Sequence, residues 1–144
     1  MLLEELMEKF NYDFVGTLNG GLLTVRQGNK WFHIHLNGTP AYTKRYDFVS
    51  GFSEGLARAC EYNQWFHINR HGNPVYGKRY EHVGDFQNGL AVVCEDSRWF
   101  HIDHYCNPAY PEKYDGVGAF HQGTTWARQN GKEFYILPTG VLID

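Results

Sequence analysis

The stretch YDFVSGFSEGLARACEYNQWFHINRHGNP at residues 46–74 decides the fold, because its pattern recurs at a fixed distance along the chain. Matching segments begin at Tyr12, Tyr46, Tyr80 and Tyr114. Each tyrosine follows the previous one by 34 residues, without insertion or deletion, as the steps from 12 to 46, 46 to 80 and 80 to 114 show. The repeats therefore run over residues 12–45, 46–79, 80–113 and 114–144. An internal period of this length is typical of repeat proteins.

Each repeat reads as three extended segments. In the second repeat they are YDFVSGF, LARACEY and WFHIN, separated by turns that contain Gly, Asn and Pro at fixed offsets. Such residues are typical of hairpins and tight turns. A pair of helices also fits a period of about 34 residues, but the glycines and the Asn-Pro pair would fall inside those helices and break them. The pattern predicts an all-β fold of four three-stranded repeats.

The first residues differ from the repeats. In MLLEELMEKF the apolar residues recur at helical spacing, with glutamates on the opposite side. We predict a capping helix over residues 1–11, followed by a single β-repeat domain over residues 12–144. We expect an open, twisted, solenoid-like stack, because 34 residues are few for a propeller blade of four strands. A small closed β-propeller is the alternative.

Composition narrows the function. The 144 residues carry a net charge of −3, which argues against binding to nucleic acid or to an anionic membrane surface. Glu4 and Glu5 stand where a signal peptide would be basic, so we expect a cytoplasmic protein. The cysteines number three, and with no sign of secretion they are predicted to be reduced.

The repeats resemble the bacterial WG-type repeat, also called the KWG repeat. The order of features in FSEGLARACEYNQWFHINRHGNPVYGKRYEHV, residues 52–83, is similar to that family's pattern, and the resemblance covers residues 12–144. This chain has Trp-Phe-His-Ile where the family has Trp-Gly-Tyr-Ile. The resemblance implies an all-β repeat array in a bacterial protein, and it brings no catalytic residues with it.

The three histidines of the Trp-Phe-His-Ile segments are His33, His67 and His101. Alternation along a strand places Phe66 and Ile68 on one face, predicted to be the core, and Trp65 and His67 on the other. If each repeat contributes three strands, matched histidines lie about 14 Å apart, too far for one zinc ion with ligands at about 2.0–2.1 Å. We therefore interpret each histidine as a structural group whose polar tip bonds a neighbouring backbone group, and we expect no metal.

The sequence contains no constellation that indicates catalysis, so we predict a protein that is not an enzyme and needs no cofactor. Repeat arrays offer extended surfaces, and the predicted function is a protein-binding or scaffolding module. The alternative is binding of a carbohydrate or another small ligand on an aromatic face. The candidate binding residues for either function are Trp31, Trp65, Trp99, His33, His67 and His101.

Overall fold

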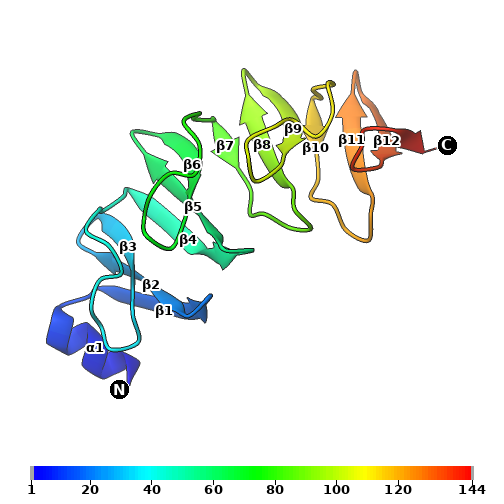
Figure 1. Ribbon diagram of the computed structural model, residues 1–144. Coiled ribbons are helices and arrows are strands. Elements are labelled where there is room, and N and C mark those ends of the chain that lie inside the picture. Colours follow the sequence, from blue (N-terminus) through cyan, green and yellow to red (C-terminus); the bar gives the residue numbers. More distant parts are fainter. Residues whose placement is uncertain (1, 144) are drawn as a thin grey trace. The chain divides into compact units, whose positions relative to one another are not determined.

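The computed structural model describes residues 2–143, which form one helix and four antiparallel sheets (Figure 1). The chain divides into two compact units, Met1–Val75 and Tyr76–Asp144. Each unit contains two sheets, and each sheet corresponds to one repeat. No helix in the described part of the chain is long and apolar enough to cross a membrane.

The first unit begins with helix α1 and continues with two three-stranded sheets. Helix α1 spans Leu3–Phe10. The first sheet has the order β1-β2-β3, and its strands are Phe14–Asn19, Leu22–Gln27 and Lys30–Ile34. The second sheet has the order β4-β5-β6, and its strands are Phe48–Ser53, Leu56–Glu61 and Gln64–Ile68.

The second unit contains the third and fourth sheets. The third sheet has the order β7-β8-β9, and its strands are His82–Val83, Ala91–Glu95 and Arg98–Ile102. The fourth sheet has the order β10-β11-β12-β13, and its strands are Gly116–Val117, Thr125–Gln129, Lys132–Ile136 and Leu142–Ile143. The predicted all-β repeat fold is confirmed, with one difference: strand β13 adds a fourth strand to the last repeat.

The hairpins follow from residues that accept a left-handed backbone. Strands β5 and β6 are joined by Tyr62 and Asn63, whose φ angles are 54° and 63°. A two-residue turn with both φ angles positive matches the right-handed twist of the strands that it joins. Tight connections of this kind leave each repeat as a compact sheet.

The predicted core face is confirmed. Phe32, Phe66 and Phe100 are at most 2% exposed. The isoleucines two residues further on are fully buried in all four repeats: Ile34, Ile68, Ile102 and Ile136. Phe and Ile therefore recur because they fill the same place in each sheet.

The first tyrosine of a repeat joins two sheets within a unit. Tyr46 exchanges two backbone hydrogen bonds with Trp31 of strand β3, of 2.8 and 3.0 Å. Tyr114 and Trp99 form the same pair in the second unit, with both distances 2.8 Å. The tyrosine thus extends the edge of one sheet while the chain enters the next, which explains why it is the most regular landmark of the sequence.

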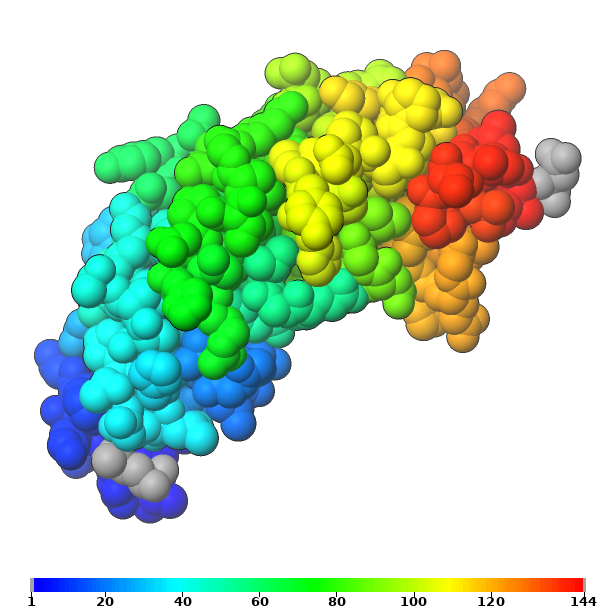
Figure 2. Space-filling model, viewed as in Figure 1, coloured from blue at the N-terminus to red at the C-terminus, as the bar shows by residue number. Residues whose placement is uncertain are grey.

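Helix α1 covers the end of the first sheet. Its Leu6 is 1% exposed, whereas Glu4, Glu5 and Glu8 face solvent. The helix ends at Asn11, which adopts a left-handed φ of 59°. In Figure 2 the helix is the blue segment at one end of the first unit. It is an apolar cap with an acidic outer surface.

Candidate functional site

The histidines predicted to be available for binding are buried. His33 and His67 are 0% exposed, and His101 is 1% exposed. The prediction that this column offers contact residues is therefore wrong for the histidines. The physical reason is that the face carrying His33 is covered by the second sheet, as its contact with Phe52 of β4 at 4.4 Å between ring centroids shows.

Both ring nitrogens of His33 are occupied. Nε2 lies 2.8 Å from the carbonyl oxygen of Ser50, and Nδ1 lies 2.6 Å from the hydroxyl of Tyr42. Because a carbonyl can only accept, Nε2 carries the proton of the neutral ring, and Nδ1 accepts from the tyrosine. This confirms the interpretation that the polar tip of the histidine satisfies a neighbouring backbone group.

His101 has the same arrangement in the second unit. Its Nε2 lies 2.8 Å from the carbonyl oxygen of Gly118 and its Nδ1 lies 2.6 Å from the hydroxyl of Tyr110. Burial lowers the pKa of both His33 and His101 to about 4, because a charged ring would lose its hydration. Both rings are therefore neutral near pH 7 and linked to the core.

The tryptophans predicted as binding residues, Trp31, Trp65 and Trp99, are half-buried. In the first unit their rings belong to a row of aromatic contacts. Between ring centroids, Trp31 lies 5.7 Å from Phe14 and 5.1 Å from Phe48. The centroid of Phe48 lies 5.7 Å from that of Trp65. Because Trp31 is flanked by two other rings, it is one component of a shared aromatic surface.

A hollow of about 840 Å³ lies beside this aromatic row in the first unit. Trp31 and Phe48 line it together with leucines from helix α1 and from the loop after β3: Leu3, Leu6 and Leu36. Several of its apolar side chains are open to solvent, since Phe14 is 44%, Leu18 51% and Leu36 59% exposed. We call this hollow the β1 groove. Exposed apolar residues gathered at one concave place are typical of binding sites.

Strand β1 lines the groove along its whole length. All six of its residues, Phe14–Asn19, line the hollow. The register of β1 shifts between Val15 and Leu18, and such an irregularity breaks the alternation of side chains between the two faces. From β1, an edge strand of the first sheet, the groove extends over Leu23 and Thr24 of β2 to β4.

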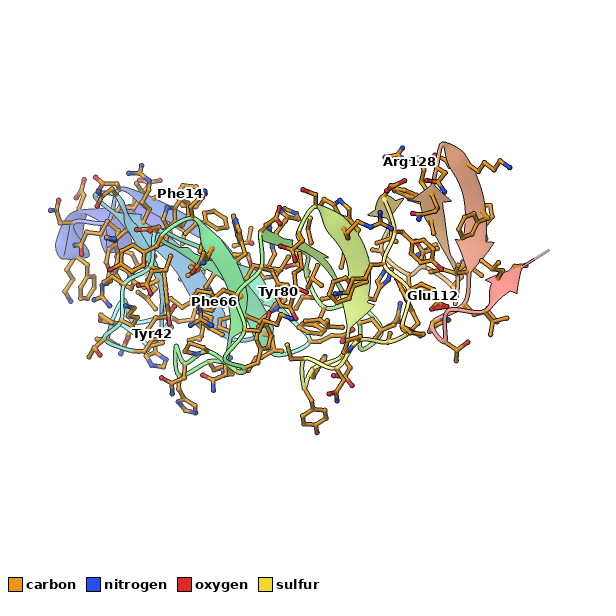
Figure 3. All side chains as sticks on the ribbon, turned by 90° about the horizontal axis from the view of Figure 1, so that it is seen from above. Phe14, Tyr42, Phe66, Tyr80, Glu112 and Arg128 are labelled. Atoms are coloured by element: carbon orange, nitrogen blue, oxygen red, sulfur yellow. The ribbon has the colours of Figure 1, made fainter. Side chains whose placement is uncertain are left out.

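The charge of the groove comes from an arginine. Arg58 is the one charged residue among the described residues that line it. Its guanidinium carbon lies 6.0 Å from the ring centroid of Phe48 and 5.9 Å from that of Trp65. The groove thus combines apolar walls with one cation held against aromatic rings. Figure 3 labels Phe14, which lies on the opposite side of this unit from Tyr42, the partner of His33.

Sequence reasoning missed most of the groove. Trp31 was a candidate, but Phe14, Leu18 and Phe48 were not. One signal was present: Phe14 and Phe48 occupy the same position of successive repeats. An apolar side chain on the face opposite the core needs a second packing partner that covers it.

The remaining candidates carry no site. Cys60 and Cys94 are free thiols that are 9% and 4% exposed, and burial raises the pKa of both thiols. Among residues 2–143 there is no group of three or more His, Cys, Asp or Glu side chains placed to hold a metal ion.

Comparison with known proteins places the repeats in a family. Residues 9–31, 34–65, 67–99 and 110–132 match the repeat family described as "WG containing repeat". The matches number four, as do the repeats predicted from the tyrosine spacing, but their boundaries differ from the predicted ones.

No curated protein matches the chain. Among solved structures, one that is similar is "KlHsv2 with loop 6CD replaced by a Gly-Ser linker", with a TM-score of 0.62 and 11% sequence identity. The match covers 92% of this chain and 52% of that one, so this chain spans about half the length of its structural relative. At this identity the likeness concerns the fold alone.

Proposed function

We propose that this chain, which belongs to the WG-containing repeat family, is a protein-binding module whose β1 groove receives an extended segment of a partner protein. The observation that carries the proposal is that all six residues of β1, an edge strand of the first sheet, line the groove. An extended peptide beside a strand edge gains main-chain hydrogen bonds, and its alternate side chains reach the pockets beside the edge.

The walls of the groove support a partner of defined chemistry. Phe14, Leu18 and Leu36 offer apolar contact, and Arg58 offers a cation. A suitable segment has apolar or aromatic residues at every second position and one Asp or Glu that reaches Arg58. The register of β1 and β2 shifts between Val15 and Leu18, so regular pairing is confined to short stretches and the side chains supply most of the contact.

The proposal includes the absence of catalysis. His33 and His101 are neutral, buried and bonded at both nitrogens, which does not suit an acid or base that must reach a substrate. The negative net charge supports a protein partner in preference to nucleic acid. The resemblance to bacterial repeats supports a bacterial protein.

Carbohydrate binding receives less support. A sugar platform needs an open ring face, whereas Trp31 is flanked by Phe14 and Phe48. The apolar lining also offers few polar groups for sugar hydroxyls.

The test is a selection of random peptides displayed on phage against the chain, followed by titration calorimetry. We expect selected peptides to alternate apolar residues and to carry an acidic residue. Leu18 is 51% exposed, so Leu18→Glu leaves folding intact and weakens binding by about tenfold or more, since a charge enters the apolar wall.

The matched control is Tyr62→Glu, because Tyr62 is 85% exposed in the same unit and does not line the groove. It is expected to bind like the unmodified chain. Equal binding by Leu18→Glu, or binding lost equally in both variants, contradicts the proposal.

A further inference from the structure

The last repeat exposes a face that the first repeat buries. On the fourth sheet Trp126 pairs with Tyr135, and Tyr135 pairs with Ile143, so the three side chains form a row across β11, β12 and β13. They are 38%, 60% and 40% exposed. Arg128 and Glu133 form the neighbouring row on the same face. We call these five residues the tail face.

The matching positions of the first sheet are covered. Trp126 and Tyr135 correspond to Thr24 and His33, which are 8% and 0% exposed because the second sheet lies against them. The tail face is thus the surface that receives the next repeat elsewhere in the array. Among the described residues, no strand covers it in the fourth sheet.

The composition of the tail face does not suit contact with water alone. Trp126 stands where the other repeats have Thr24, Arg58 and Val92. Its indole lies against Gly116 of β10 and against Gly118, which follows that strand, since a Cβ atom added at either glycine would meet the ring. The ring is therefore held in place by its own sheet, and a fixed aromatic surface loses little conformational entropy on binding.

We propose that the tail face binds the tail face of a second copy of this chain. The face is complementary to itself in charge, since Arg128 and Glu133 lie side by side with 3.9 Å between their charged groups. A two-fold axis can set Arg128 of one copy opposite Glu133 of the other, twice. The two charges cancel on the face, so the chain's net charge of −3 does not concentrate there.

The arrangement of two copies follows from the tail face itself. Because its charges are complementary to each other, two tail faces can meet across a two-fold axis, and an isologous contact closes as a dimer without growing into a fibre. This inference is independent of the β1 groove, which belongs to the first unit.

The test is the molecular mass in solution, measured by light scattering from about 5 to about 100 µM, the range in which contacts of modest size form. We expect the unmodified chain to rise from its monomer mass of 16.7 kDa towards twice that value. Tyr135→Glu is expected to weaken association at least tenfold with an unchanged melting temperature. Tyr105→Glu, at a residue 83% exposed in the same unit, is the control and should associate normally.

A charge exchange identifies the partner surface. Arg128→Glu alone and Glu133→Arg alone each place like charges opposite one another, and each is expected to weaken the homodimer. An equimolar mixture of the two variants restores opposite pairs and should form a heterodimer. A monomeric unmodified chain throughout the range, unchanged association of Tyr135→Glu, or a mixture that stays monomeric overturns the proposal.

Discussion

His33 and Tyr135 occupy the same position of the first and the fourth repeat, yet their surroundings are opposite. His33 is fully buried with both ring nitrogens bonded, whereas Tyr135 is 60% exposed. The strand around each is similar, and each strand pairs in the same register with its neighbour. What differs is the following sheet: β4 lies against His33, and no described strand lies against Tyr135.

The residues of a repeat therefore do not determine by themselves whether its outer face is buried. The neighbour supplies the carbonyl of Ser50 and the ring of Phe52 that enclose His33. A histidine suits that place because it spans two polar partners, and an exposed position has no such requirement. In repeat proteins each unit buries its core only by stacking on the next.

The largest effect that we expect is loss of stability at acid pH. His33 and His101 have pKa values of about 4 in the folded chain and about 6.5 when unfolded. The unfolded chain therefore binds more protons between these values, and stability falls as the pH falls from about 6.5 to about 4. Between about pH 7.5 and about pH 5 the two histidines should cost roughly 4 kcal/mol of unfolding free energy.

Urea denaturation across that range measures this dependence. Tyr135→His is the control, because it adds a histidine at an exposed position of the fourth repeat and should leave the dependence on pH unchanged. Replacing His101 with Gln should remove about half of the loss. Stability that is flat from about pH 7.5 to about pH 5 would contradict a neutral, buried His33 and His101.

Truncation compares the two positions directly. His33→Ala leaves the Ser50 carbonyl and the Tyr42 hydroxyl without their partner and opens a cavity, so we expect a loss of about 3 kcal/mol. Tyr135→Ala should cost less than about 0.5 kcal/mol, since the side chain is exposed. Urea denaturation of dilute samples at pH 7 gives both values, and equal losses would remove the distinction between covered and uncovered faces.

A smaller effect isolates one hydrogen bond of His33. Tyr42→Phe removes the hydroxyl that lies 2.6 Å from Nδ1 and leaves a buried acceptor unsatisfied, at a cost of about 1.5 kcal/mol. Tyr105→Phe, at an exposed tyrosine, is expected to change nothing. Thermal melts of the two variants make the comparison, and a harmless Tyr42→Phe would show that the bond contributes no stability.

The smallest effect concerns the surface of the same repeats. Lys44 lies 2.6 Å from Glu61, but its side chain is 50% exposed. Solvent screens such a pair, so Lys44→Gln should change the unfolding free energy by less than about 0.5 kcal/mol in the urea experiment used for His33. A loss comparable to that of His33→Ala would show that this exposed ion pair holds the repeat together.

The repeats, the hairpins and the Phe/Ile core were predictable, because a strand's own alternation fixes which side chains share a face. The burial of the face that carries Trp and His was not predictable in this way. Alternation along a strand says that Trp and His share a face, but not whether the next sheet covers that face; the face is covered in the first repeat and uncovered in the fourth, where Glu133 and Tyr135 replace Trp and His. A column of tyrosines nine residues after each histidine, Tyr42, Tyr76 and Tyr110, was the signal that partners lay nearby.

The β1 groove was less predictable still. It is lined by residues of α1, of strands β1 to β5 and of the loop after β3, so it depends on how a helix and two sheets pack within the first unit. The sequence indicates each element by its periodicity, but the distance between Leu3, Phe14 and Phe48 is a property of their packing. Tertiary placement of this kind has no local pattern.

The enclosure of the histidines by the following sheet is tested most directly by a nitrogen-detected NMR titration of the histidine rings. We expect His33 and His101 to remain in the neutral form with the proton on Nε2 as the pH is lowered, and to titrate near pH 4. Titration near the ordinary value of about 6.5, or a proton on Nδ1, would contradict the claim that the following sheet encloses these rings.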